Sequence, residues 1–137
     1  MSTPAGRHTR TCPCGSGAAF ARCCGPYVGD GLPAPTAEAL MRSRYTAYAL
    51  GVDDHIFRTW HPRTRPADTA PDPSLRWDSL EVLEVSGGGE EDAEGFVTYR
   101  ARWSTPAPDH QRGELRERSQ FVRRANRWVY LGPDPQF

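Results

Sequence analysis

Four cysteines lie close together near the start of this 137-residue chain: Cys12, Cys14, Cys23 and Cys24. They form a C-x-C pair and then, after eight intervening residues, a C-C pair, and no other cysteine follows. Four thiolates satisfy the tetrahedral coordination of a Zn²⁺ ion, with each sulfur about 2.3 Å from the metal. The spacing therefore predicts a closed metal centre that holds one zinc ion per chain.

The residues between the two pairs favour the same interpretation. Glycines at 15 and 17 let the chain reverse, and residues 18–23 are expected to form a short turn of helix that Gly25 and Pro26 end. Phe20 is the one large apolar side chain in this stretch, which is too little to offset the entropy of ordering it. A structural zinc ion supplies that free energy.

Charge and redox chemistry favour a zinc centre over disulfides and over a redox-active dithiol. A Zn²⁺ ion with four thiolates carries a formal charge of about −2, which Arg10 and Arg22 are expected to balance. Two disulfides are disfavoured in a reducing compartment, and the C-x-x-C pattern of a redox-active dithiol is absent. An iron–sulfur cluster stays open as an alternative, because four cysteines suit it too.

Composition predicts a cytoplasmic protein. The first residues contain no apolar core typical of a signal peptide, and no apolar run approaches the roughly 20 residues of a membrane span. The net charge is zero, which disfavours nucleic acid and membrane surfaces as partners. The 17 basic residues are all arginine, so any cation that faces a ligand is a planar, permanently charged group.

Two helices are expected after a proline- and glycine-rich linker. The first spans residues 36–50, with Thr36 as its N-cap and Gly51 at its end. Its apolar face is Leu40, Met41, Tyr45 and Tyr48. The second begins at Asp53 as the cap and stops before Pro62. Its inward residues are expected to be Ile56, Phe57 and Trp60.

Four strand-like runs follow a polar, proline-rich loop. They span residues 76–85, 95–104, 113–124 and 128–132. The second alternates, with Val97, Tyr99, Ala101 and Trp103 on one face. Helices followed by an antiparallel meander predict an α+β fold in which a curved sheet packs over the helices.

The cysteine segment "CPCGSGAAFARCCG" resembles the SEC-C motif, the zinc knuckle of SecA and of many other bacterial proteins. The resemblance assigns the four metal ligands to Cys12, Cys14, Cys23 and Cys24. In SecA the knuckle is associated with binding SecB and ribosomes, which implies a protein partner. The motif often has histidine as its fourth ligand and lysines after the glycines, whereas this chain has cysteine and mostly alanine there. Without those lysines, contact with nucleic acid is not expected.

The whole chain resembles the YchJ family through "LMRSRYTAY", "TWHP", "ERSQF" and the "PQF" ending. The resemblance implies a SEC-C knuckle over residues 1–28, a linker over 29–35 and, over 36–137, a domain similar to nuclear transport factor 2. That domain is a cone-shaped curved sheet wrapped by helices. It encloses a cavity suited to a small-molecule ligand, and dimers through its outer sheet face are common, so a homodimer is an expectation. The resemblance implies no biochemical role.

Three side chains are the candidates for chemistry in such a cavity: Arg44, His61 and Glu117. Arg42 and Arg44 lie two residues apart on a helix, so at most one faces the cavity. That arginine either binds an anionic ligand or, as we favour, pairs with a carboxylate such as Glu117 across the core. Glu117 shares a strand face with apolar residues and is expected to point inward.

His61 is interpreted as the cap of a helix end rather than as a general base. His55 is assigned to packing or the surface, and His8 and His110 to loops. The six arginines between residues 112 and 127 are interpreted as a solvated sheet face, because acidic residues interrupt them. No known catalytic motif is present, so no catalytic residue is assigned.

Two classes of function are therefore carried forward. The first is a zinc-binding cytoplasmic protein whose knuckle is structural or docks a partner, attached to a ligand-binding or interaction domain. The alternative is a small-molecule enzyme that works in the cavity of the α+β domain.

Overall fold

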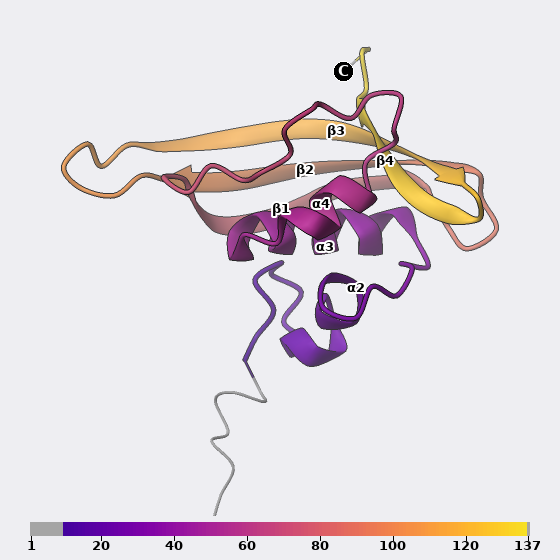
Figure 1. The fold of residues 1–137 in the computed structure, drawn as a ribbon, viewed down its shortest axis with the longest axis horizontal. Coiled ribbons are helices and arrows are strands. Elements are labelled where there is room, and N and C mark those ends of the chain that lie inside the picture. The colour runs from indigo at the N-terminus through magenta and orange to yellow at the C-terminus, as the bar shows by residue number, and fades with distance from the viewer. Residues whose placement is uncertain (1–9, 137) are drawn as a thin grey trace, which may run out of the picture.

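The computed structural model describes residues 10–136 (Figure 1). The predictions for His8, for the first residues of the knuckle and for Phe137 lie outside this range. One four-stranded antiparallel sheet has the order β1-β2-β3-β4. The strands are β1 (Arg76–Gly87), β2 (Glu94–Ser104), β3 (Arg112–Arg124) and β4 (Arg127–Pro133). Each run expected from the sequence is present, which confirms the α+β class.

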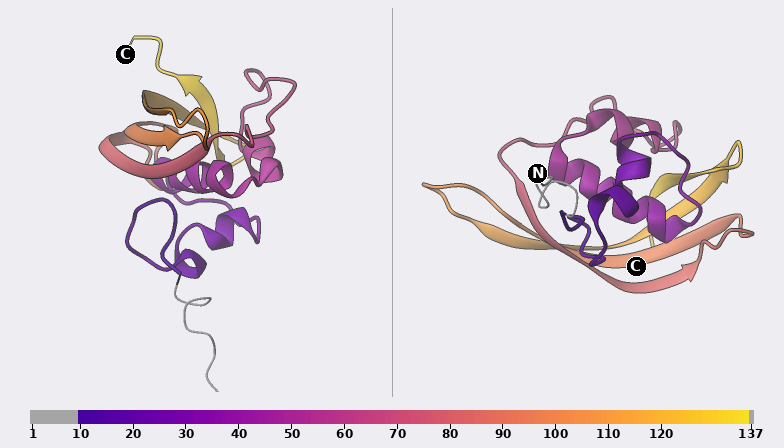
Figure 2. Two further views of the ribbon diagram at one scale, coloured as in Figure 1. Left: turned by 90° about the vertical axis from the view of Figure 1, so that its left-hand side faces the viewer. Right: turned by 90° about the horizontal axis from the view of Figure 1, so that it is seen from below.

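The molecule has three layers, which Figures 1 and 2 show from three sides. The curved sheet covers two helices, α3 (Ala37–Leu50) and α4 (Asp53–Arg58), and the cysteine-containing segment packs on the other side of α3. That segment holds a short 3-10 helix, η1 (Phe20–Arg22), and a single α-helical turn, α2 (Gly25–Val28). Helix α3 is therefore the central layer of the fold.

Helix α3 has the ends that its sequence predicts. The Thr36 side chain accepts a hydrogen bond from the Ala39 amide at 3.1 Å, and Gly51 adopts the left-handed conformation (φ 77°) that ends the helix. Its predicted apolar face is confirmed, with Leu40, Met41 and Tyr45 buried and Tyr48 half-buried. This face packs on β1, β2 and β4.

Helix α4 differs from the expectation in two respects. Asp53 is its first residue rather than its cap, because Val52 occupies the cap position, where its apolar side chain accepts no hydrogen bond from the helix amides. Its buried residues are His55 and Ile56, whereas Phe57 is 42% exposed, so the prediction that Phe57 faces inward was wrong. A six-residue helix has room for only one narrow buried face, and each residue turns the next by about 100°.

The short elements of the cysteine segment also differ from prediction. The expected helix over residues 18–23 is a 3-10 turn of three residues. Gly25 and Pro26 do not end the unit, because they begin α2. Proline suits the first turn of a helix, where its missing N–H has no partner to lose.

A single hydrophobic core joins the layers. It includes Cys12, Cys14 and Cys24, Leu40 and Met41 of α3, and residues of the sheet such as Val97 and Phe121. The predicted alternation of β2 is confirmed, with Val97 and Ala101 buried on the face toward the helices. The cysteine segment thus adds directly to the core of the larger domain.

Candidate metal centre and cavity

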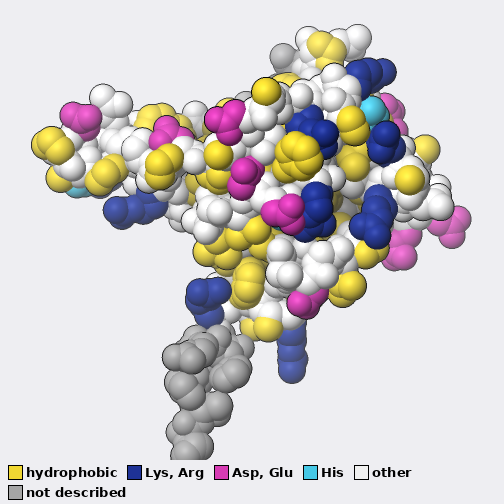
Figure 3. Space-filling model, viewed as in Figure 1, with side chains coloured by type: hydrophobic (Ala, Val, Ile, Leu, Met, Phe, Trp, Pro, Cys, Tyr) yellow, Lys and Arg dark blue, Asp and Glu magenta, His cyan; other side chains and the backbone are white. Residues whose placement is uncertain are grey.

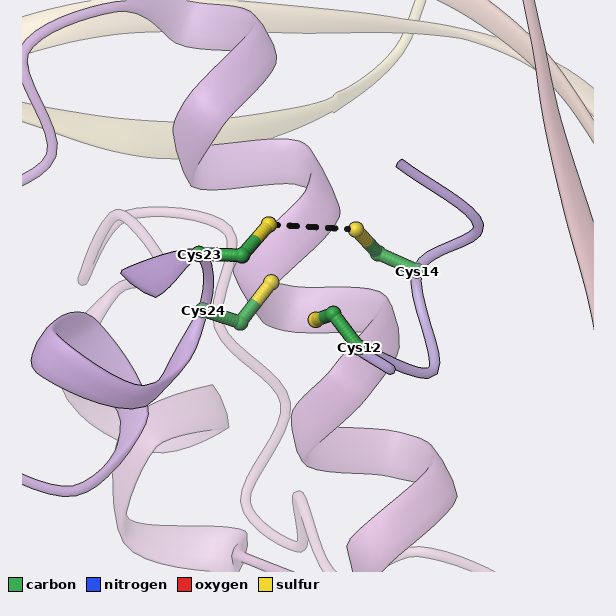
Figure 4. A group of neighbouring side chains, drawn as sticks. All are labelled: Cys12, Cys14, Cys23 and Cys24. Atoms are coloured by element: carbon green, nitrogen blue, oxygen red, sulfur yellow. Dashed lines mark hydrogen bonds between the residues drawn. The ribbon is translucent and has the colours of Figure 1, made fainter. Parts of the chain in front are cut away.

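The four cysteines converge into one cluster. One sulfur from each lies within 4.8 Å of every other, and Cys14 Sγ is 3.5 Å from Cys23 Sγ. Figure 4 shows the pairs approaching from two separate turns, with α3 behind them. Cys12, Cys14 and Cys24 are buried and Cys23 is partly exposed. Four soft sulfur donors at this separation can hold one metal ion, in agreement with the sequence prediction.

Backbone hydrogen bonds set the two turns before any metal is considered. The Cys12 amide donates to Ala18 O at 2.8 Å, and the Gly15 amide donates to Cys12 O at 3.2 Å. The Cys23 amide donates to Phe20 O at 3.0 Å, which places both sulfurs of the second pair against those of the first. Gly15 has φ 80°, a value that a side chain rarely adopts.

Hydrogen bonding and burial shift the pKa values of Cys14, Cys23 and Cys24 in different directions. The hydrogen bond from Cys24, with further donation from Ser16, lowers the pKa of Cys14 to about 4. The pKa of Cys24 is raised, first by that same hydrogen bond to Cys14 and then by burial. Burial is the largest cause of the raised pKa of Cys23. Thiols this close cannot all ionise without a cation among them.

Arg42 supplies the positive charge beside this cluster. Its Nη1 donates to Cys14 O at 3.0 Å and lies 3.8 Å from Cys14 Sγ, while its Nε bonds to Glu38 at 3.0 Å. The sequence assigned this role to Arg10 and Arg22. Instead, Arg10 stacks on the Phe20 ring and Arg22 is exposed at the end of η1. Proximity in sequence did not indicate Arg42, because the docking of the turns on α3 is what brings it to the sulfurs.

A cavity of about 270 Å³ lies on the other side of α3, between the helices and the sheet. Aromatic side chains make most of its wall: Tyr45, Tyr48, Trp60, Trp77, Tyr99, Phe121 and Tyr130. The two charged residues among its described lining are Arg44 and Glu117. The expected cavity is therefore present, with two of its three candidate residues.

Arg44 is 6% exposed and lacks a carboxylate partner. Its Nη1 donates to Ile56 O at 3.0 Å and to Thr59 Oγ1 at 2.7 Å, and its guanidinium lies 4.9 Å and 4.6 Å from the ring centres of Trp60 and Tyr130. Within residues 10–136, no carboxylate oxygen comes within 4.0 Å of it. Burial is the main cause that lowers its pKa. The favoured Arg44–Glu117 ion pair was thus wrong.

Glu117 points into the cavity, as its strand position predicted. One of its carboxylate oxygens, Oε2, accepts hydrogen bonds from Ser119 and from the Tyr130 hydroxyl, each at 2.6 Å. Burial first, and then the charge of Glu117, raise the pKa of both Tyr99 and Tyr130. The carboxylate is therefore held by hydroxyl groups, which leaves its negative charge uncompensated at short range.

His61 is not among the described residues that line the cavity. Its amide donates to Tyr130 O at 2.8 Å, and its Nδ1 accepts from the Arg63 amide at 3.0 Å, so it joins the end of the α4 segment to β4. His55 is buried, and its Nε2 lies 2.9 Å from Ser43 Oγ. Since that hydroxyl donates to Leu40 O, the His55 Nε2 is the protonated nitrogen.

The sequence did not single out Tyr99, Trp77 or Tyr130 as cavity residues. Strand alternation placed Tyr99 on the inner face of the sheet. Tyr130 of β4 lies directly opposite Phe121 of β3, and paired residues share a sheet face, so Tyr130 also faces the cavity. That pairing depends on the two-residue turn at Ala125 and Asn126, which both have positive φ (52° and 66°).

The fold and the cysteine cluster define a class of protein: a SEC-C knuckle on an NTF2-like domain. The family model described as "YchJ, middle NTF2-like domain" matches residues 36–133, and the model described as "SEC-C motif" matches residues 11–26. The chain belongs to the YchJ family. The described part of the chain contains no helix of the length and apolar character that a membrane span requires.

Relatives named UPF0225 protein match over most of their length. One from Streptomyces coelicolor is 46% identical over 122 residues, which cover 89% of this chain and 93% of the relative. One from Chromobacterium violaceum is 47% identical over 124 residues, with 88% and 89% covered. The names of these relatives do not state a biochemical role.

Two solved structures of SEC-C motif containing proteins share the fold. The solution structure from Rhodopseudomonas palustris has a TM-score of 0.76 at 33% identity and covers 90% of this chain and 97% of its own. The crystal structure from Psychrobacter arcticus has a TM-score of 0.70 at 27% identity, with 93% and 82% covered. The predicted fold and family are confirmed.

Proposed function

We propose that this protein is a zinc-stabilised, cytoplasmic small-molecule binding protein. The metal would be one Zn²⁺ ion per chain, bound by the thiolates of Cys12, Cys14, Cys23 and Cys24. A set of four sulfur donors, three of them buried, leaves no open coordination position for water or substrate. This supports a structural role for the ion, with iron as the competing metal.

The position of the cluster supports the same role. Phe20 and Tyr27, the side chains that a docking surface on the knuckle would need, are both half-buried and pack against the core. The ion would therefore fix the two cysteine turns on α3 and Arg42. The half-burial of these two rings leaves a partner that docks on the knuckle little apolar surface to bind.

The proposal that the protein binds a small molecule rests on Arg44. A buried guanidinium without a carboxylate partner is costly, and an anionic ligand in the adjoining cavity would offset that cost. Guanidinium groups match carboxylates in shape and hydrogen bonding. Aromatic walls favour a planar ligand, and Glu117 accepts a hydrogen bond from a hydroxyl. These features favour a small aromatic carboxylic acid with a hydroxyl group.

The experiment is an NMR titration of the metal-bound protein with 4-hydroxybenzoate. We expect shift changes at Arg44, Tyr99 and Tyr130, and weaker binding of 4-hydroxybenzamide, which has the same shape without the charge. The variant Arg44→Met should bind the acid and the amide equally weakly, while Arg112→Met on the exposed start of β3 should behave as the natural chain does. Equal binding of acid and amide by the natural chain would contradict the role of Arg44.

The enzyme alternative has less support. Glu117 is the one acid among the described lining residues, and no described histidine lines the cavity beside it. General acid–base work on a bound ligand needs a group whose proton can be exchanged near neutral pH. The cavity thus favours binding over catalysis.

A further inference from the structure

A second hollow, of about 390 Å³, lies on the surface between the linker, α4 and the β3–β4 turn. We call it the basic groove. Its apolar floor includes Leu40, Trp128 and Val129, and four arginines line it: Arg58, Arg65, Arg124 and Arg127. Figure 3 shows dark blue side chains gathered over α4 and β4, with apolar side chains between them. It is distinct from the aromatic cavity, although Trp60 separates the two and lines both.

Three of the four arginines have no charge partner within the described residues. Arg58 pairs with Asp54 at 2.7 Å, whereas no carboxylate oxygen comes within 4.0 Å of Arg65, Arg124 or Arg127. Arg65 donates to Phe57 O and lies 3.7 Å from the centre of the Phe57 ring. The groove therefore has a surplus of positive charge, although the whole chain has a net charge of zero.

Two of these arginines face each other across the end of a hairpin. Arg124 and Arg127 are directly paired in the β3–β4 register, with Ala125 and Asn126 as the turn between them. Like charges at directly opposed positions destabilise a strand pair. The positive field also reaches His61, whose pKa is lowered by desolvation and then by the charges of Arg63 and Arg124. An anion bound between the strand ends would remove this repulsion.

The groove is also apolar where it is most accessible. Leu32 is 55% exposed and Phe57 is 42% exposed, and both line it. Large apolar side chains that surround a concave surface together with unpaired cations are typical of a binding surface. The partner must therefore offer negative charge and at least one apolar side chain.

We propose that the basic groove binds an acidic segment of another protein that carries an aliphatic or aromatic side chain between its carboxylates. The carboxylates would meet Arg65, Arg124 and Arg127, and the apolar side chain would lie on Leu32 and the floor. A nucleic acid fits less well, because base stacking needs open aromatic faces and the Phe57 ring already carries Arg65. This proposal is independent of the ligand in the aromatic cavity.

The test uses fluorescence polarisation of the metal-bound chain with four labelled probes. The first is a short peptide of aspartate and glutamate with one leucine and one phenylalanine. In the second, serine replaces the two apolar residues, and in the third, asparagine and glutamine replace the acids. The fourth is a single-stranded oligothymidylate. We expect the first peptide to bind most tightly, with an affinity that falls as salt is raised.

Surface variants locate the binding without disturbing the core. Arg127→Glu should weaken the first peptide at least about tenfold, while Arg112→Glu, the same change at the far end of β3, should change it by less than about twofold. Leu32→Ser should weaken binding too, whereas Leu50→Ser, at another exposed leucine on the end of α3, should not. Circular dichroism and metal content confirm that each variant is folded.

Several results would overturn the proposal. These are no binding of the first peptide, equal binding of the third peptide, tighter binding of oligothymidylate, or equal losses from Arg112→Glu and Arg127→Glu. Tighter oligothymidylate binding that Arg127→Glu abolishes would assign the groove to nucleic acid instead.

Discussion

Arg42 and Arg44 stand two residues apart on α3 and serve opposite faces of it. Arg42 reaches the cysteine turns, while Arg44 enters the aromatic cavity. The sequence predicts this divergence from helical geometry, but it does not predict what each side chain meets. That depends on the docking of the cysteine turns and of the sheet on α3, which involves residues far apart in the chain.

The hydrogen bond from Arg42 to the cysteine turn predicts a change in metal affinity. Arg42→Gln removes the cation beside Cys14 and should weaken metal binding by about 10–100-fold, because groups around the ligands tune the metal. Competition with a chromophoric zinc chelator measures it. Arg22→Gln is the matched control and should bind metal as tightly as the natural chain does. Weaker binding by Arg22→Gln together with unchanged binding by Arg42→Gln would show that Arg22, and not Arg42, balances the charge.

The burial of Arg44 predicts an unusual effect on stability. Arg44→Met removes a desolvated charge that has no carboxylate oxygen of the described residues within 4.0 Å, and it keeps most of the apolar volume of the side chain. The free energy of unfolding should stay within about 1 kcal/mol of the natural value or rise. Urea unfolding of the metal-bound chain measures it. A loss of more than about 3 kcal/mol would assign Arg44 a structural role instead of a ligand-binding one.

At the scale of elements, the start of α3 is fixed against the β1–β2 hairpin by glycines. The Ala37 amide donates to Gly88 O at 2.9 Å, and a Cβ on Gly88 would lie 2.6 Å from the Ala37 Cβ. A Cβ on Gly95 would overlap the backbone of Gly88. The close approach of these backbones sets how α3 lies on the sheet, and hence the cavity.

This contact predicts a stability cost for a single methyl group. Gly95→Ala should lower the free energy of unfolding by about 1–3 kcal/mol, since neither backbone can move away without shifting α3. Gly89→Ala is the control, because its Cβ would meet only the flexible Asp92 carboxylate at 3.2 Å and should cost less than about 1 kcal/mol. Chemical denaturation measures the free energy of unfolding of both variants. Equal losses for Gly95→Ala and Gly89→Ala would contradict a tight contact between Gly95 and Gly88.

Element length explains which elements could be predicted. Helix α3 and the long strands repeat their periods often enough to be recognised, and Thr36 and Gly51 mark the helix ends. The single turn of α2 and the six residues of α4 are too short to establish a period. Tertiary packing decides them, which is why Phe57 turned outward and Gly25 began a helix.

At the scale of the whole molecule, the cysteine turns and the sheet occupy opposite sides of one helix. Residues 10–28 should lose order when the metal is removed, because four neighbouring thiols, three of them buried, are then left without the cation that lets them ionise together. The sheet keeps its own hydrogen bonds and its face of the core. Hydrogen-exchange mass spectrometry with and without a chelator should show faster exchange in residues 10–28 and on the Arg42 side of α3. Uniform loss of protection across β1–β4 would contradict this separation.

The sequence alone predicted the cluster of four cysteines, because all four lie within 13 residues and local turns suffice to bring them together. The cavity brings together residues from 41 to 130, since α3 and all four strands contribute to its wall. Strand alternation gave the direction of Glu117. That no carboxylate of residues 10–136 forms an ion pair with Arg44 is a property of the folded core alone.

Native mass spectrometry of protein purified without added metal, paired with elemental analysis, tests the central claim most directly. We predict one zinc ion per folded chain, with Cys12, Cys14, Cys23 and Cys24 protected from alkylation until a chelator is added. A metal-free native mass, or thiols that react freely in the folded protein, would contradict the account.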